Sequence, residues 1–259
     1  MATRLEAPAT PRQTQRADQR EVRCDGVTRR FGAVTALESV TLHAAPDEVV
    51  AVVGPSGSGK STLLELVCGL QEPDAGSVSA GRAVLMPQRD GLLPWLSALD
   101  NAALPLRIAG ADRRSARERA AAMLEELGLA GFERARTWEL SGGMRQRVAV
   151  ARTLLAGAPV LCLDEPFGAL DAITRAELQS WLAAVLVREP RTVLLVTHDV
   201  EEAALLGHRI VVLSPRPGRV VAEVAVEAPA GPRKPTDPAV VAARAAALEA
   251  LSAAMEGAR

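Results

Sequence analysis

The feature that most constrains this chain is a glycine-rich loop at residues 54–62, with the sequence Gly-Pro-Ser-Gly-Ser-Gly-Lys-Ser-Thr. An apolar run at 49–53 precedes it and reads as a buried strand, and an apolar segment at 63–68 that can continue as a helix follows it. The spacing G-x-x-x-x-G-K-S in a strand–loop–helix context is the phosphate-binding P-loop. The alternative, a merely flexible Gly/Ser loop, does not account for that context. The loop therefore predicts a site for a nucleoside triphosphate.

The residue types of this loop suit phosphate chemistry. Its glycines let the backbone curl, so that successive N–H groups face one concavity and can cradle phosphate oxygens. Lys60 adds a positive charge for the β- and γ-phosphates, and the Ser61 hydroxyl is placed to bind Mg²⁺. The nucleotide-binding residues predicted in the loop are Gly54, Pro55, Ser56, Gly57, Ser58, Gly59, Lys60, Ser61 and Thr62.

Two adjacent carboxylates, Asp164 and Glu165, end an apolar run at 159–163. Parallel sheets bind ligands at the edge formed by the C-terminal ends of their strands. Asp164 can hold Mg²⁺ through its water shell, and Glu165 is placed to polarise an attacking water. Such a pair could also be a helix N-terminal charge. We favour the catalytic interpretation, because a P-loop already requires a carboxylate for Mg²⁺.

Residues 140–147, Leu-Ser-Gly-Gly-Met-Arg-Gln-Arg, predict a second anion site at the start of a helix. Ser141 offers a hydroxyl, Gly142 and Gly143 offer free N–H groups, and the helix dipole adds its positive end. Taken alone, these residues could form an ordinary helix N-cap. One cradle per triphosphate is sufficient, so a second phosphate site indicates a second subunit.

Composition narrows the class of protein. A chain of 259 residues, 48% apolar and 24% charged, can form one large α/β domain or a core with a smaller insert. The net charge of −1 argues against a nucleic-acid binder with a large basic surface. Three widely spaced cysteines suit a reducing compartment and give no metal site. No apolar stretch approaches the ~20 residues needed to span a bilayer, and the N-terminus lacks the apolar segment of a signal peptide. We therefore expect a cytoplasmic chain, linked to a membrane only through a partner.

The pattern along the chain divides it into three parts. Residues 1–20 hold hardly any large apolar residues and predict a disordered tail. Residues 21–226 hold the motifs, with a helical subdomain expected at about 91–153. Residues 227–259 begin with a proline-rich linker and end in an alanine-rich helix. Strands are expected at 22–27, 40–44, 77–80, 83–86, 159–163, 192–197, 210–213 and 220–226.

Taken together, the motifs resemble the ATP-binding subunit of an ABC transporter over about residues 21–226. Gln88 matches the Q-loop glutamine, residues 140–146 the signature, Asp164 with Glu165 the Walker B motif, residues 169–171 the D-loop, and His198 the switch histidine. Phe31 matches the adenine-stacking aromatic; a core-edge position is its alternative interpretation. The resemblance implies an α/β fold: a P-loop NTPase (RecA-like) core with an antiparallel β subdomain and an inserted α-helical subdomain.

The resemblance also implies a set of site residues. Glu165, His198 and Lys60 are expected to be catalytic. Ser61, Gln88 and Asp164 are expected to bind Mg²⁺. The ATP-binding residues expected beyond the loop are Phe31, Gln88, Ser141, Gly142, Gly143, Gln146 and Asp171.

The partners implied are a second copy of the chain, in a head-to-tail dimer with two ATPs at its interface, and a transmembrane permease. An extracytoplasmic solute-binding protein would act indirectly, and the chain would sit at the cytoplasmic face of the membrane. Residues 88–95, with Leu92, Leu93 and Trp95, are expected to dock on the permease. The alternative is that these three side chains pack the subdomain core.

A finer resemblance is to the nitrate/sulfonate/taurine branch of importers, which includes importers of pyrimidine precursors of thiamine. It rests on residues 88–95, 99–101, 164–171 and 213–219. Two features depart from the branch: Glu65 stands where Arg is frequent, and the hairpin expected between Gly76 and Gln88 is short. A soluble ABC-type ATPase not coupled to transport is the alternative function. A P-loop small-molecule kinase would lack residues 140–146 and His198.

Overall fold

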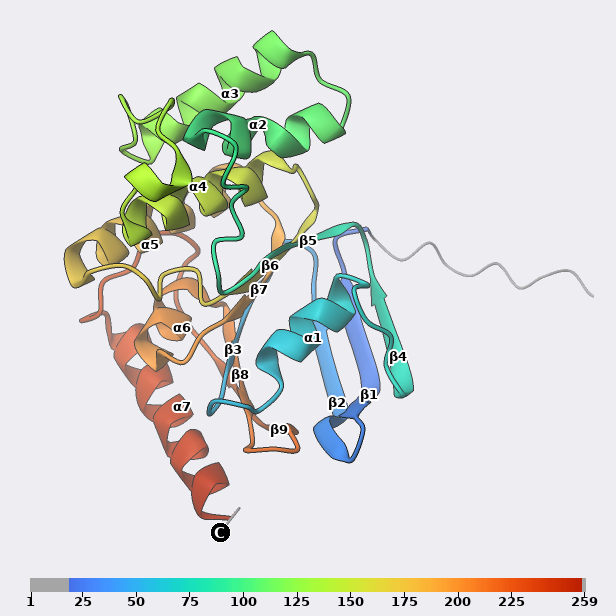
Figure 1. Ribbon diagram of the computed structural model, residues 1–259. Coiled ribbons are helices and arrows are strands. Elements are labelled where there is room, and N and C mark those ends of the chain that lie inside the picture. The colour runs from blue at the N-terminus through green and yellow to red at the C-terminus, as the bar shows by residue number, and fades with distance from the viewer. Residues whose placement is uncertain (1–18, 258–259) are drawn as a thin grey trace, which may run out of the picture.

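The computed structural model describes residues 19–257, so nearly all of the predicted N-terminal tail lies outside the described residues. A six-stranded sheet, in the order β5-β6-β7-β3-β8-β9, forms the centre of the molecule (Figure 1). All of its strand pairs are parallel except β8 with β9, which form an antiparallel hairpin from the strands expected at 210–213 and 220–226. Its strands are β3 (Val49–Val53), β5 (Ala83–Met86), β6 (Val160–Asp164), β7 (Thr192–Val196), β8 (Arg209–Leu213) and β9 (Val220–Ala225).

The three central strands β3, β6 and β7 are buried at every residue. Their continuous Val/Leu-rich sequences are typical of parallel strands that are covered on both faces. This burial explains why the apolar runs of the sequence predict these strands closely. Each of them then delivers a polar loop at its C-terminal end, and these loops form the site described below.

A second, antiparallel sheet has the strand order β2-β1-β4 and matches the predicted β subdomain. Its first two strands are longer than the apolar runs indicate, because partly exposed residues continue the pairing to Phe31 and Val34. The strands are β1 (Val22–Phe31), β2 (Val34–Ala44) and β4 (Ala75–Ala80).

The expected hairpin between Gly76 and Gln88 is wrong. β4 pairs with β1, whereas β5 pairs with β6, so the two strands belong to different sheets. The physical reason lies in their side chains. β4 alternates small and polar residues on a largely exposed strand, while β5 is wholly apolar and suits the covered parallel sheet.

Helix α1 (Lys60–Val67) lies between the two sheets (Figure 1). Leu63, Leu64 and Leu66 are buried in one cluster with residues of both sheets. The P-loop that starts this helix is therefore held between two packed layers.

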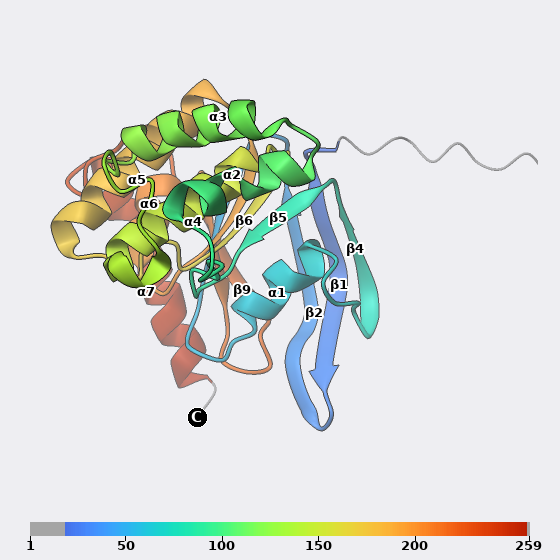
Figure 2. The ribbon, with the colours of Figure 1, turned by 45° about the horizontal axis from the view of Figure 1, so that its top comes forward.

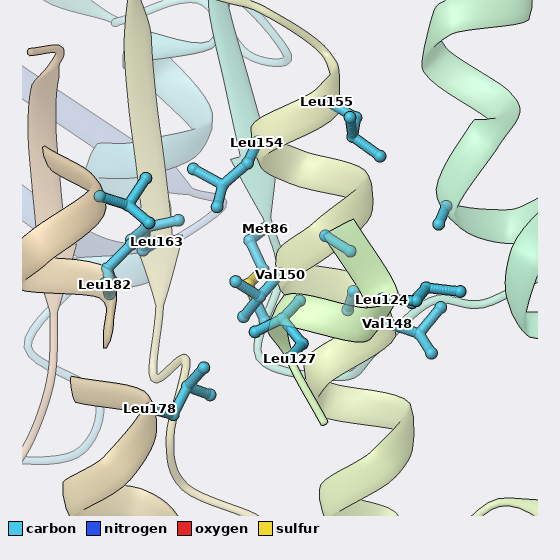
Figure 3. Packing of buried hydrophobic residues seen from close by; sticks show 14 of the residues in the cluster. Met86, Leu124, Leu127, Val148, Val150, Leu154, Leu155, Leu163, Leu178 and Leu182 are labelled. Carbon is cyan, nitrogen blue, oxygen red and sulfur yellow. The ribbon is translucent and has the colours of Figure 1, made fainter. Parts of the chain in front are cut away.

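The helical subdomain forms a separate layer above the parallel sheet (Figure 2). The side chains of Ser97 and Asp112 accept backbone N–H bonds at the starts of its first two helices. In Figure 3, Leu154 lies on the side of the third helix that faces Leu163 of the sheet, and Val148 lies on the side toward the other helices. The subdomain comprises α2 (Ala98–Ile108), α3 (Arg113–Glu126), the 3-10 turn Thr137–Glu139 and α4 (Gly142–Leu155).

The remaining helices are α5 (Ala172–Arg188), α6 (Val200–Leu206) and α7 (Pro238–Glu256). By length and composition, α7 is the one helix within residues 19–257 that could cross a membrane, although no such span was predicted from the sequence. One face of α7 packs on α6, β8 and β9 through Val240, Ala243 and Ala247. Arg244 also pairs with Glu201 of α6. These contacts hold α7 against α6 and the edge of the parallel sheet; the predicted boundary at residue 226 stays a prediction.

Candidate nucleotide-binding site

Three loops meet at one edge of the parallel sheet. The P-loop follows β3, the Asp164–Glu165 pair ends β6, and His198 follows β7. β7 lies directly between β6 and β3, so the C-terminal ends of three adjacent strands carry these groups. This edge is where open parallel sheets bind ligands.

The P-loop has the backbone that its glycines permit. Gly57 and Gly59 take left-handed φ values of +79° and +89°, which glycine adopts without steric cost. A Cβ at position 59 would lie 2.5 Å from a methyl carbon of Leu37, so the loop is also closely packed. The Nζ of Lys60 donates to Gly54 O at 2.7 Å and to Pro55 O at 2.9 Å. Burial lowers the pKa of Lys60, while Glu165 and Asp164 act to raise it.

A cavity of about 370 Å³ opens over this loop. Ten of the predicted site residues line it, together with three that no sequence motif predicts. The predicted ones are Phe31, Ser56, Gly57, Gly59, Lys60, Ser61, Thr62, Gln88, Asp164 and Glu165, and the others are Val34, Ala36 and Arg216.

Phe31 is at the end of β1 and is 46% exposed, so it is not part of the core. The guanidinium carbon of Arg29 lies 4.9 Å from the centroid of its ring, which is a cation–π distance. The ring therefore has one cationic neighbour and still lines the cavity. Stacking of a base on Phe31 stays a prediction.

Asp164 and Glu165 have different environments. Asp164 is 6% exposed; burial raises the pKa of its carboxyl, and a hydrogen bond with the Ser61 side chain lowers it. Glu165 has φ +48°, unusual for a residue with a side chain, and strained residues of this kind cluster at functional sites. Its Oε2 accepts from Gln88 Nε2 at 3.3 Å and lies 3.1 Å from His198 Nδ1.

The residues predicted for Mg²⁺ offer a suitable donor set. Ser61, Asp164 and Gln88 all line the cavity, and the Ser61 side chain acts to lower the pKa of Asp164. A hydroxyl, a carboxylate and an amide are hard oxygen donors of the kind that Mg²⁺ prefers. No group of three or more His, Cys, Asp or Glu side chains that could hold a metal ion occurs within residues 19–257. The predicted set therefore contains a single protein carboxylate, that of Asp164.

Ser141, Gly142 and Gly143 start helix α4, as predicted, but do not line this cavity. The Oγ of Ser141 accepts the Met144 N–H at 3.2 Å, so it also serves as an N-cap. The side chain of Asp171 likewise caps α5 by accepting from Ile173 and Thr174 N–H groups. Within one chain, these residues and the P-loop are thus parts of different surfaces.

Gln146 requires a correction. Its side chain is 2% exposed, and its Nε2 donates to Pro166 O at 2.8 Å. The amide therefore ties α4 to the loop after β6 and is not available to a nucleotide in this arrangement. Its position in the signature suggested contact with ATP; the helix places it on the face toward the sheet, which the motif does not reveal.

The P-loop, the carboxylate pair and the histidine on adjacent strands define a P-loop nucleoside triphosphatase. Comparison with known proteins narrows this class: the family described as "ABC transporter" matches residues 37–168. The chain belongs to the ABC transporter family, and it is an ATP-binding, ATP-hydrolysing subunit of that family.

Individual relatives agree with this assignment. The chain is 49% identical over 206 residues to the taurine import ATP-binding protein TauB of Sinorhizobium fredii, covering 76% of this chain and 77% of that one. It is 48% identical over 203 residues to the protein of the same name from Burkholderia thailandensis, covering 74% and 78%. Among solved structures, the dimeric post-hydrolysis ATP-binding cassette MJ0796 bound to ADP and Pi aligns with a TM-score of 0.73 and 31% identity. That alignment covers 80% of this chain and 99% of the other.

Proposed function

We propose that this chain energises an importer of a small sulfonate of the taurine type. The observation that carries the proposal is the 49% identity, over 77% of the relative's length, to a taurine import ATP-binding protein. The solute itself would be selected by other subunits, since none of the motifs of this chain recognises a sulfonate. Nitrate and a pyrimidine precursor of thiamine are the competing solutes within the same branch of importers.

In the proposed cycle, two copies associate head to tail. ATP lies over residues 54–62 of one copy, and Ser141, Gly142 and Gly143 of the other copy close over its γ-phosphate. The dimeric ATP-binding cassettes of similar structure support this arrangement. So does the exclusion of residues 141–143 from the P-loop cavity of their own chain.

The chemical step is assigned to residues of the sheet edge. The carboxylate of Glu165 accepts a proton from the attacking water. His198, 3.1 Å from that carboxylate, holds the water and the γ-phosphate in register. Lys60 stabilises the charge on the transferred phosphoryl group. Ser61, Asp164 and Gln88 would hold Mg²⁺, which would supply positive charge to neutralise the phosphates.

The link to a permease is placed at residues 88–95. Leu92 is 8% exposed and belongs to the core, whereas Trp95 is 66% exposed. The exposed Trp138 lies on the same subdomain, where Arg136 bonds to the carbonyl of Trp95. Exposed aromatic side chains of this kind are typical of a docking site. Through it, the chain would sit at the cytoplasmic face of the membrane, with an extracytoplasmic binding protein as an indirect partner.

The test is reconstitution of the chain with its permease and binding protein in ATP-loaded vesicles. We expect uptake of labelled taurine, with little competition from nitrate or a hydroxymethylpyrimidine. Lys60→Ala, which should not bind ATP productively, serves as the negative control. Uptake of nitrate or pyrimidine in place of taurine would reassign the solute. ATP hydrolysis that proceeds without any response to the permease would favour a soluble ABC-type ATPase.

A further inference from the structure

The turn between β8 and β9 brings a second positively charged side chain, in addition to Lys60, to the nucleotide cavity. Residues 214–219 of this turn have the sequence Ser-Pro-Arg-Pro-Gly-Arg. Arg216, at its tip, lines the cavity together with Phe31 and the P-loop. Its Nε donates to the carbonyl oxygen of Gly57 at 3.3 Å. The roles assigned above make no use of this residue.

The fold holds the turn in place without the arginine side chain. Gly218 donates to Ala36 O at 2.9 Å and accepts from the Glu38 N–H at 3.0 Å. A Cβ at position 218 would lie 1.9 Å from Ser58 O, so the turn is packed directly on the P-loop. Ser214 Oγ donates to Pro217 O at 2.9 Å and accepts from the Arg219 N–H at 3.0 Å. Backbone contacts therefore position Arg216, and the side chain is not needed to build the turn.

The guanidinium lies over the glycine that makes room for it. A Cβ at position 57 would be 2.9 Å from Arg216 Nη2, and Gly57 has φ +79°. Within residues 19–257, the bond from Nε is the one hydrogen bond that Arg216 makes through its guanidinium. Its two Nη groups thus remain available on an exposed surface of the cavity. By contrast, Lys60 is buried and already donates to two carbonyls of the loop.

The charges of the cavity leave a place for a second cation. Asp164 and Glu165 line one part of the wall, and Lys60 and Arg216 are the basic residues among the lining side chains. A nucleoside triphosphate adds several negative charges close to the two carboxylates. A guanidinium offers a planar fork of N–H donors, which matches the oxygens of a phosphate better than an ammonium does.

We propose that Arg216 is a further nucleotide-binding residue, whose Nη groups donate to phosphate oxygens of the nucleotide from the side of Gly57. The proposal rests on the proposed function in one respect, since it takes residues 54–62 as the phosphate cradle. A different role, as a tie that only keeps the P-loop in shape, predicts a change in stability without a specific phosphate contact.

The experiment compares Arg216→Ala and Arg216→Lys with Arg219→Ala in the full chain. Arg219 is a matched control: it belongs to the same turn but pairs with Glu38 away from the cavity. Dissociation constants are measured for ATP, and for inorganic tripolyphosphate in competition with a fluorescent ATP analogue. We expect roughly tenfold weaker binding of both ligands to Arg216→Ala, as charge-assisted contacts warrant. Arg216→Lys should lose less, Arg219→Ala nothing, and the melting temperature without nucleotide should stay unchanged.

Three results would overturn the proposal. Unchanged affinity of Arg216→Ala for both ligands would show that Arg216 does not contact the nucleotide. Weaker binding of ATP but not of tripolyphosphate would assign the contact to the base or ribose. A lower melting temperature that accompanies the affinity loss in both Arg216 variants makes the residue a structural tie. Lys60→Ala separates this inference from the proposed function. If Lys60→Ala abolishes ATP binding while Arg216→Ala leaves it unchanged, residues 54–62 are still the phosphate site and only the role of Arg216 is wrong. If Lys60→Ala retains ATP binding, the assignment of residues 54–62 as the phosphate site is wrong.

Discussion

The carboxylate of Glu165 and the imidazole of His198 meet across two adjacent strands, with Oε2 and Nδ1 3.1 Å apart. The same oxygen accepts the Gln88 amide at 3.3 Å. These side chains follow β6, β7 and β5, which are neighbours in the sheet. One oxygen atom therefore links the ends of three strands, and any movement of the Gln88 loop alters the surroundings of the proposed base.

Glu165→Gln should separate binding from hydrolysis. The amide keeps the shape and the contact with His198, but it cannot accept the proton of water, so ATP turnover should fall by about 10²–10⁴-fold. ATP should still close the dimer, which size-exclusion chromatography with ATP would detect as a long-lived species. A variant that stays monomeric and keeps hydrolysing would show that Glu165 is not the base.

Ser141→Arg should block hydrolysis in trans and leave binding intact. Ser141 starts α4 and is not part of the P-loop cavity of its own chain. A bulky cation there should obstruct closure over the partner's nucleotide. We expect unchanged affinity of the isolated subunit for an ATP analogue and loss of ATPase in the assembled complex. Ser252→Arg, on an exposed part of α7, is the control. Loss of affinity in the isolated subunit would contradict the head-to-tail arrangement.

Leu92→Ala should reduce stability, whereas Trp95→Ala should impair assembly with the permease. Leu92 is buried in the main core, and its truncation should cost about 2–5 kcal/mol of unfolding free energy. Trp95 is 66% exposed, so its truncation should change stability by no more than about 0.5 kcal/mol. We expect Trp95→Ala to lose co-purification with the permease while it still binds ATP. Ile108→Ala, at an exposed position on α2, should neither destabilise the chain nor lose co-purification. Normal assembly of Trp95→Ala would move the docking site elsewhere.

Glu202→Gln should change how stability depends on pH. Glu202 is 5% exposed, and burial raises the pKa of its carboxyl from 4.5 to about 8, against the hydrogen bonds from Thr197 and Gln179. Between these values the folded state binds more protons than the unfolded state, so the contribution of Glu202 to stability falls as pH rises. Glu202→Gln has no titrating carboxyl at this position, so its stability should not fall for this reason as pH rises. Its advantage in unfolding free energy, measured by urea denaturation, should grow from pH 5 to pH 8, with a slope of up to about 1.4 kcal/mol per pH unit. Glu201→Gln, exposed beside it, controls for surface charge; parallel curves for wild type and Glu202→Gln would show that Glu202 titrates normally.

Local sequence determined the chemistry of the site and the strands that carry it. The P-loop is contiguous, so the role of its glycines and Lys60 can be predicted from nine consecutive residues. β3, β6 and β7 are buried on both faces, and their sequences are therefore almost entirely apolar. Predicted site residues lie at or directly after the C-terminal end of each of these strands. This position at the strand ends was sufficient to predict that the P-loop, Asp164 with Glu165, and His198 lie at one edge of the sheet.

Only the tertiary structure decided three further points. β4 and β5 lie in different sheets although only Gly81 and Arg82 separate them in the sequence, because pairing depends on partners far along the chain. Gln146 points into the core and not to a nucleotide, since the helix face that carries it is packed on the loop after β6. Arg216 reaches the P-loop across 159 residues of sequence. Local patterns encode which groups a segment carries, whereas the contacts between distant segments set where each group points.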